Sequence, residues 1–387
     1  MNPLLLALVP ILAGAQGEIS AGIGANSNPF ELPGTTAPGA MAPRPASYVP
    51  LHAFGDVHYE LRESFRIGLR AALDGDLYTW VARDPVIGES ANPRDASHGT
   101  ATVAAPFSWL GDDGARRLTL TVEPFAGAHR ETFTSPVTAR PYVAGGISFG
   151  RRFDTNRAGG KLSGEFELGP TIDTYAAVSY QRVDYLEDYR GIPSVDSWDH
   201  GELRVDADAW AYPRGAVLSA AYSFRRRDYD ARFPHDVAGN RVLPGTGGFV
   251  PQVFYFHDAT LKAGFEGDAG HAFVRADFER RIDAFAGYLS YTDLGAAIEL
   301  RVVSGAWTIA AQPGFSVRFY DTARVNYDPL EPVNRRVRLD ASGSVERALS
   351  ATTSLWLQAG WTDQRTPNAL YSFSAVRAAT GVRLRWR

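Results

Sequence analysis

The sequence predicts an all-β fold: a transmembrane antiparallel β-barrel of about sixteen strands, with fourteen or eighteen as the alternatives. From about Tyr48 onward, apolar and polar residues alternate in one segment after another, which is the period of a strand with one apolar and one wetted face. Turn residues separate these segments, and short connections are interleaved with long ones, as in a barrel whose two rims differ. No later stretch has the ~20 consecutive apolar residues of a membrane-spanning helix.

The first fifteen residues have the pattern of a cleaved signal peptide. An apolar run from Leu4 to Ala13 leads into Ala13-Gly14-Ala15, a small-residue pattern that predicts cleavage before Gln16. The run is too short to cross a bilayer as a helix, and the alternative is a buried strand or helix at the N-terminus. We therefore expect residues 1–15 to be removed during export.

Two further parts follow in the chain. Residues 16–47 contain a short first strand, Glu18 to Asn26, and a segment rich in Pro, Gly and Ala that we expect to be a loop or strap. Residues 48–387 form the remainder of the barrel. A chain that enters and leaves a barrel on the same side of the membrane needs an even number of strands. A barrel of this size encloses an aqueous lumen.

The alternation is clearest in the second half of the chain. In the segment 201–212, Leu203 and Val205 fall on one face, while Arg204 and Asp206 fall on the other. The last predicted strand alternates apolar and basic residues in the same way: Val382, Leu384 and Trp386 against Arg383, Arg385 and Arg387. We expect the apolar face of each strand to meet lipid and the charged face to line the lumen.

Connections and strand-end aromatic residues give the predicted barrel two distinct rims. Short connections are expected at 212–215, 266–270, 303–306 and 348–351, and long ones at 190–199, 234–252 and 328–334. Aromatic residues near strand ends predict an interfacial girdle, with ordinary core aromatics as the alternative: Tyr185, Tyr189, Tyr229, Phe233, Tyr320, Tyr327, Trp361, Tyr371 and Phe373.

The exported start, the alternating segments and the strand-like end "RLRWR" resemble Gram-negative outer-membrane β-barrels over essentially the whole mature chain. The Arg-rich strands are also similar, in pattern, to the barrel portions of exopolysaccharide-export proteins. The resemblance implies a multi-pass barrel in the cell outer membrane, in contact with outer-membrane lipid. It implies recognition by the barrel-insertion machinery, although Trp386 is here followed by Arg387 where such chains end on the aromatic residue. Periplasmic polysaccharide-export proteins would be further partners.

Strict alternation places a set of basic residues on the inner face of the better-parsed strands after Gly201. These lumen-lining candidates are Arg204, Arg225, Arg227, Arg275, Arg281, Arg301, Arg318, Arg336, Arg338, Arg377, Arg383 and Arg385. Their guanidinium groups would attract carboxylate, sulfate or phosphate groups and favour anions. The alternative is a structural ladder in which they pair with acidic residues of neighbouring strands. We expect most of them to pair and a few unpaired ones to set selectivity.

Five aromatic residues also fall on the inner face. They are Trp210, Phe254, Phe256, Phe273 and Trp356. Exposed rings in a wet lumen cost free energy, so two explanations are open: the rings stack on the C–H faces of a glycan, or an inward-folded loop covers them. The segment 234–252 has enough Gly and Pro to fold inward as a constriction or lid.

Composition and motifs exclude several functional classes. The chain has no Cys, which excludes disulfides, Cys-ligated metals and a cysteine nucleophile. Its eight His residues are scattered, with no zinc-protease, nucleophile-elbow or P-loop motif, so we expect neither an enzyme nor a metal or other cofactor. A net charge of −4 gives no basic footprint for nucleic acid.

The function that fits these features best is export of an anionic exopolysaccharide across the outer membrane through a basic lumen. The alternative is a general or anion-selective porin for small solutes, in which case small anions replace the anionic glycan as substrate. A surface adhesion or assembly barrel, which would use the long loops instead of the lumen, is a further alternative.

Overall fold

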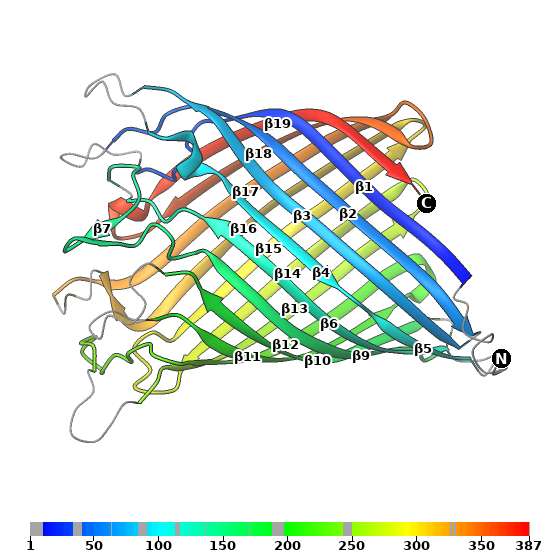
Figure 1. Cartoon of the computed structure of the whole chain (residues 1–387), viewed down its shortest axis with the longest axis horizontal. Coiled ribbons are helices and arrows are strands. Elements are labelled where there is room, and N and C mark those ends of the chain that lie inside the picture. The colour runs from blue at the N-terminus through cyan, green and yellow to red at the C-terminus, as the bar shows by residue number, and fades with distance from the viewer. Residues whose placement is uncertain are drawn as a thin grey trace, which may run out of the picture.

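The computed structural model describes residues 11–33, 41–62, 64–83, 91–112, 117–135, 137–169, 171–187, 197–242, 250–325, 328 and 330–386. These residues form a closed antiparallel barrel (Figure 1). Its strands are β1 (Ile11–Asn26), β2 (Ala46–Arg62), β3 (Phe65–Val81), β4 (His98–Ala104), β5 (Phe107–Asp112), β6 (Arg117–Glu131), β9 (Thr155–Glu167), β10 (Ile172–Tyr185), β11 (His200–Ala211), β12 (Ala216–Tyr229), β13 (Val253–Gly267), β14 (Gly270–Asp283), β15 (Tyr291–Ser304), β16 (Trp307–Arg324), β17 (Val333–Ala348), β18 (Thr353–Arg365) and β19 (Phe373–Trp386).

The sheet contains seventeen strand segments that make sixteen spanning strands, because β4 and β5 are two halves of one strand. Both halves pair with β3 on one side and with β6 on the other. Pro106 interrupts them, since proline has no N–H to give to the ladder. The predicted fold class and strand number are therefore confirmed. A separate two-stranded hairpin, β7 (Val143–Ala144) and β8 (Ile147–Ser148), lies between β6 and β9.

The barrel closes between its first and last strands. β1 pairs with β19 from Gly17 opposite Trp386 to Asn26 opposite Arg377. Seven short connections and both ends of the described chain lie at one rim, and the long loops lie at the other (Figure 1). We call these the turn rim and the loop rim. The described helices, Pro93–Ala96, Pro213–Gly215 and Ala369–Tyr371, are each a single short turn, and none of them has the length or hydropathy to cross a membrane.

The first strand is longer than the sequence predicted. It begins at Ile11 instead of Glu18, and residues Ile11 to Ala15 pair with the end of β2. All pairs between β1 and β19 begin at Gly17 or later. Removal of residues 1–15 would therefore leave the closing seam of the barrel complete.

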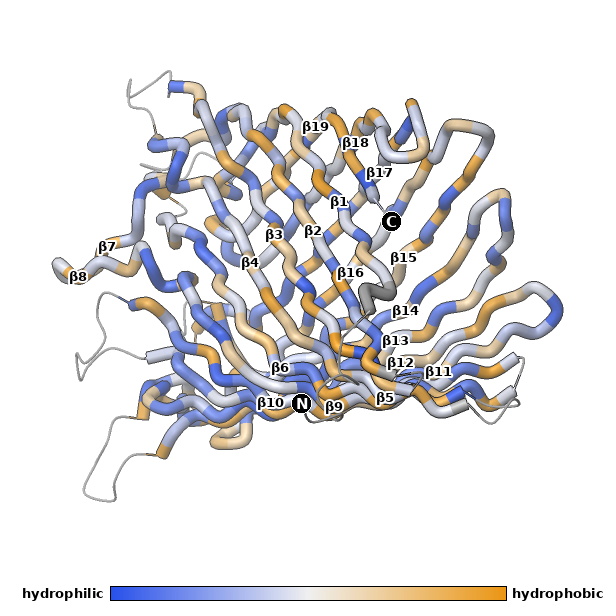
Figure 2. Tube along the Cα trace, turned by 45° about the vertical axis from the view of Figure 1, so that its right-hand side comes forward, coloured by the Kyte–Doolittle hydropathy of each residue, from blue (hydrophilic) through white to orange (hydrophobic). Residues whose placement is uncertain are grey.

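The strands alternate between a mainly apolar outer face and a mainly polar inner face. Along β19, Val382, Leu384 and Trp386 are exposed on the outside, while Arg383 and Arg385 face inward and pair there. Figure 2 shows the same alternation of hydrophobic and hydrophilic residues along the other strands. Arg387 lies outside the described residues.

Only some of the residues that the sequence suggested for an aromatic girdle are exposed. Tyr229, Phe233 and Phe373 are buried, at 4–5% exposure, and Tyr185 and Tyr320 pack on neighbouring rings. Of the predicted set, Trp361 and Tyr371 are exposed, while Tyr189 and Tyr327 lie outside the described residues. Exposed rings also follow the turn rim, where an interface belt is expected: Phe65, Trp109, Phe166, Tyr212, Phe265, Trp307 and Trp386.

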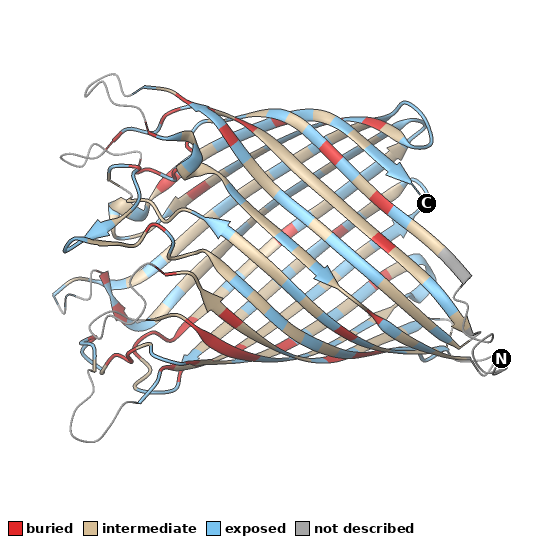
Figure 3. Cartoon of the chain, in the orientation of Figure 1, coloured by how far each residue is buried: buried red, intermediate tan, exposed pale blue. Residues whose placement is uncertain are grey.

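The described parts of the long loops fold over the loop rim, where Figure 3 shows buried residues at the bases of the loops. In the loop after β1, the Asn28 amide donates to the carbonyl oxygens of Leu32 and Ser374. Further along the same loop, the Met41 N–H donates to the Val137 carbonyl in the loop after β6. Two loops distant in sequence thus hold each other above the lumen.

Candidate functional site: the lumen

The inner wall of β11–β19 is a ladder of charged side chains. Arg275 on β14 reaches Glu299 on β15 at 2.9 Å, and Lys262 on β13 reaches the same carboxylate at 2.7 Å. Arg318 and Arg336, on β16 and β17, share Asp293 of β15 at 2.8 and 3.1 Å. The ladder links successive strands and leaves few uncompensated charges.

The structure separates the twelve predicted arginines into three groups. Nine form ion pairs with Asp or Glu: Arg204, Arg225, Arg227, Arg275, Arg318, Arg336, Arg338, Arg383 and Arg385. Arg281 donates to the Leu289 carbonyl oxygen. Arg301 and Arg377 form no hydrogen bond or ion pair with any residue that the structure describes, and both line cavities in the lumen. Sequence alternation could not tell which of the twelve arginines were paired.

Among the charged residues on the inner face of the opposite wall, β2–β10, carboxylates predominate. By alternation these are Asp56, Glu60, Asp74, Asp76, Glu123, Glu131, Glu165, Glu167 and Asp173. Some are neutralised, as where Arg70 bridges Asp56 and Glu123 at 3.0 Å each. The lumen therefore has a basic side and an acidic side. The acidic side was not predicted, because alternation was applied only to the strands after Gly201.

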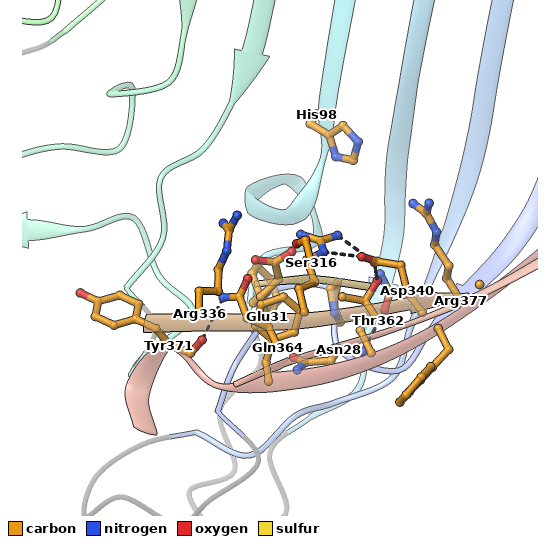
Figure 4. A pocket seen from close by; sticks show the side chains of 18 of the residues that line it. Asn28, Glu31, His98, Ser316, Arg336, Asp340, Thr362, Gln364, Tyr371 and Arg377 are labelled. Atoms are coloured by element: carbon orange, nitrogen blue, oxygen red, sulfur yellow. Dashed lines mark hydrogen bonds and ion pairs between the residues drawn. The ribbon is translucent and has the colours of Figure 1, made fainter. Parts of the chain in front are cut away.

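A cavity of about 1500 Å³ lies between these two sides. Arg318 and Arg336 line it from the basic wall, and Asp76 and Glu131 from the acidic wall. Glu31, from the loop after β1, also lines it. Figure 4 shows Arg377 extending from β19 into this space without a marked interaction with another drawn residue. A charged solute in the cavity would experience a field directed across the lumen.

Glu31 should make the charge of this cavity depend on pH. Burial raises the pKa of Glu31, the nearby Arg338 guanidinium lowers it, and Glu131 raises it further, with a net upward shift. As pH falls from 7 toward 5, Glu31 is therefore expected to lose its charge before ordinary carboxylates do. Anion preference should then increase, as measured by reversal potentials across a planar bilayer at a series of pH values.

A Glu31→Gln variant separates Glu31 from the other titratable groups of the cavity, which include Asp95 and His98. In that variant anion preference should already be higher at pH 7, and the early part of the pH dependence should be lost. An unchanged pH profile in the variant would contradict the assignment.

The seam of the barrel is bridged by an ion-pair network near the turn rim. Glu18 of β1 contacts Arg383 and Arg385 of β19 at 2.8 Å each. Both arginines also pair with Glu346 of β17. These two predicted lumen arginines thus join β17, β19 and β1, and both have carboxylate partners, unlike Arg377.

The two inward phenylalanines of β13 are covered. Phe254 is 1% exposed and Phe256 is 5% exposed, beneath Tyr288 and Leu289 from the connection between β14 and β15. The Arg281 guanidinium lies 4.8 Å from the centre of the Phe254 ring, a cation–π distance. The sequence left two explanations open for these rings, glycan stacking and coverage by a loop. The structure favours coverage by a loop.

Phe273 and Trp356 are also buried, at 5% and 6% exposure. A Cβ atom added to Gly264 would lie 2.6 Å from the Phe273 ring, and one added to Gly381 would lie 2.7 Å from the Trp356 ring. Each ring thus lies against the bare backbone of a cross-strand glycine. This packing is a known stabilising device in sheets, and it leaves little ring surface for a sugar.

Trp210 differs from the other four lumen aromatics because it is only partly buried. It lines a smaller cavity of about 330 Å³ near the turn rim, together with Tyr175, Asp173 and Glu165. Its surroundings are acidic. The ring remains a candidate for glycan stacking, but on a different side of the lumen from the unpaired arginines.

Only the base of the predicted inward segment 234–252 can be placed, because residues 243–249 lie outside the described residues. Pro234 and Gln252 are buried, and the Gln252 amide contacts the Asp283 carboxylate at 2.5 Å. Val237 is 77% exposed. The base of the segment is therefore fixed to the barrel mouth.

The histidines near strand ends contact residues that strand pairing places next to them. His129 contacts the Thr100 hydroxyl at 2.8 Å and Glu131 at 3.1 Å, and Thr100 is its cross-strand partner. His257 contacts the Tyr222 hydroxyl at 2.7 Å. Within the described ranges, no group of three or more His, Asp or Glu residues could hold a metal ion.

Comparison with known proteins identifies a fold. No protein-family model and no curated protein matches the sequence. Among solved structures, OccAB1 of Acinetobacter baumannii is similar, with 11% identity and a TM-score of 0.51 over 98% of this chain and 99% of that chain. The chain has the fold of an outer-membrane β-barrel.

Two further solved structures match over nearly their whole length. The anion-selective porin of Comamonas acidovorans has 10% identity and a TM-score of 0.46, covering 96% of this chain and 99% of that chain. A bacterial polysaccharide outer membrane secretin has 9% identity and a TM-score of 0.46, covering 97% and 100%. At such identities and TM-scores these two structures say nothing about the function of the chain, which has to be argued from its own lumen.

Proposed function

We propose that the barrel is an outer-membrane channel that passes anionic solutes along its basic wall. The observation that carries the proposal is the cavity of about 1500 Å³ between the charged walls of a closed barrel. Arg377 projects into that cavity without a carboxylate partner among the described residues. An apolar outer face and a charged, wetted inner face are what a membrane channel requires.

Small solutes fit this geometry better than a long polymer. The described loops narrow the mouth, and four of the five aromatic residues considered for glycan stacking are buried. We therefore favour an anion-preferring channel for small solutes, which was the alternative at the sequence level.

Export of an anionic exopolysaccharide is the second candidate. It is favoured by the polar but uncharged part of the cavity lining, where Ser316, Ser342, Thr362 and Gln364 could bond to sugar hydroxyls. Periplasmic polysaccharide-export proteins would be partners in this case only. Both candidate functions share three expectations. These are export of the chain with removal of residues 1–15, recognition by the barrel-insertion machinery, and contact with outer-membrane lipid.

Ion selectivity tests the proposal. The refolded chain, shown to be a barrel by its heat-modifiable migration on a gel, would be inserted into a planar bilayer under a KCl gradient. We expect conducting events and a reversal potential that favours chloride, because the unpaired guanidinium groups attract anions into the path.

A folded barrel that does not conduct would overturn the channel, and a preference for potassium would overturn the anionic path. Current measured in the presence of acidic oligosaccharides of increasing length separates the two candidates. Passage of long chains would favour export, whereas exclusion of all but the short chains would favour the small-solute channel.

A further inference from the structure

A second, smaller cavity contains both of the predicted arginines that lack a partner. Its volume is about 360 Å³, and Arg301 and Arg377 both line it. Both side chains are exposed to the lumen. Neither forms an ion pair or hydrogen bond with any residue in the described ranges. Each guanidinium therefore keeps its donors available to a ligand.

Strand register places the two arginines at opposite ends of this depression. Arg301 is on β15 and lies opposite Ala310 of β16, whereas Arg377 is on β19 and lies opposite Gly360 of β18. Four strand spacings separate them, about 19 Å along the sheet before the curvature and the inward reach of the side chains shorten the gap. This separation suits an extended solute with an anionic group near each end better than one small ion.

The floor between the two arginines is made of small and uncharged residues. Cavity-lining residues on the intervening strands are Ala310, Gln312, Ser342, Ser344, Gln358 and Gly360. The small side chains create the depression, and the hydroxyl and carboxamide groups offer both hydrogen-bond donors and acceptors. Such a floor suits the hydroxyl groups of a polyol or saccharide.

Other charged or titratable groups at the cavity do not reverse its preference for anions. Glu299 lines it, but this carboxylate is already paired with Lys262 at 2.7 Å and with Arg275 at 2.9 Å. His271 and Tyr48 also line it and carry no negative charge at neutral pH. The two guanidinium groups are therefore its uncompensated charges.

We propose that this cavity is a binding subsite for a linear, hydroxyl-bearing dianion, with one anionic group on Arg301 and the other on Arg377. The inference rests on the proposed anion channel and names the class of solute that would pause there. Acidic saccharides with carboxylates on successive units have this chemistry.

Calorimetry on the folded, detergent-solubilised barrel tests the subsite without requiring conductance. The probes are digalacturonate, its monomer galacturonate as a monoanion, and suberate as a dianion without hydroxyl groups. The variants are Arg301→Gln, Arg377→Gln and the two charge-retaining Arg→Lys substitutions. Arg157→Gln is the matched control, because Arg157 is an inward arginine on the opposite strand β9, has no ion pair among the described residues and does not line the cavity.

We expect digalacturonate to bind more tightly than galacturonate to the wild type. Either Arg→Gln substitution should weaken digalacturonate binding about tenfold, the size expected for loss of one charge-assisted hydrogen bond. Galacturonate should respond less, because it can occupy either end, and each Arg→Lys variant should recover part of the affinity. Arg157→Gln should leave both affinities within about twofold of wild type, since a distant charge is screened.

The outcomes distinguish this inference from the channel proposal. Equal binding of digalacturonate and galacturonate, or equal effects of Arg157→Gln and Arg301→Gln, would overturn the subsite even in a conducting barrel. Equal affinities for suberate and digalacturonate would overturn the proposed contribution of the floor hydroxyl groups to binding. Selective binding by a barrel that does not conduct would uphold the subsite and overturn the channel.

Discussion

Replacing Trp356 by alanine is expected to lower the stability of the barrel by about 3–5 kcal/mol, the usual cost of truncating a buried tryptophan in a core. Its indole ring is 6% exposed on the inner face of β18. It lies over Gly381 of β19 and Gly22 of β1, which are paired with each other across the seam. The truncation would remove the ring that covers the closing strands.

Loss of stability would be measured as a fall in the temperature at which the folded gel band converts to the unfolded one, and as a shift in the urea midpoint. Trp356→Phe, which keeps a ring on the glycines, should lose less. Trp210→Ala is the matched control, because Trp210 is only partly buried and does not lie over this glycine pair. If Trp356→Ala left stability unchanged but weakened saccharide binding, the ring would be a ligand platform and the packing argument would be wrong.

The orientation of the faces could be predicted from the sequence because it depends on a local rule, and the strand number followed from counting such segments together with the need for an even number. The period of two fixes which side chains share a face, so Val382 and Leu384 could be assigned to the outer face and Arg383 to the lumen. The order of short and long connections fixed which rim holds the chain ends. The β4–β5 strand shows the limit of the rule, because Pro106 breaks its pattern without ending the strand.

Two features could not be predicted in the same way: which lumen arginines form ion pairs, and which inward rings are covered by loops. Whether a lumen arginine is neutralised depends on residues one or two strands away, as with Arg336 on β17 and Asp293 on β15. Whether an inward ring is exposed depends on loops distant in sequence, as with Phe254 under Leu289. Arg301 likewise faces Ala310 on β16 and His271 on β14, and neither cross-strand neighbour offers a carboxylate.

Replacing Asp293 by asparagine should produce the largest change in selectivity. Its carboxylate is 2.8 Å from Arg318 and 3.1 Å from Arg336. Without it, Arg318 retains only Glu279 at 3.5 Å, and Arg336 has no other ion pair among the described residues. Both arginines line the large cavity. Two guanidinium groups that line the cavity would thus lose the charge compensation of Asp293.

The reversal potential of the Asp293→Asn variant should therefore shift further toward the chloride potential, and its stability should fall by about 1–3 kcal/mol for the lost charged hydrogen bonds. The matched control is Asp363→Asn. Asp363 pairs with Arg365 at 2.8 Å on the outer face of β18, so the variant loses the same charge and the same kind of ion pair away from the lumen. Equal shifts in the two variants would mean that net charge alone sets selectivity. A shift confined to Asp293→Asn would show that the carboxylates of the basic wall neutralise its arginines. Ion pairing would then decide which guanidinium groups interact with a passing solute.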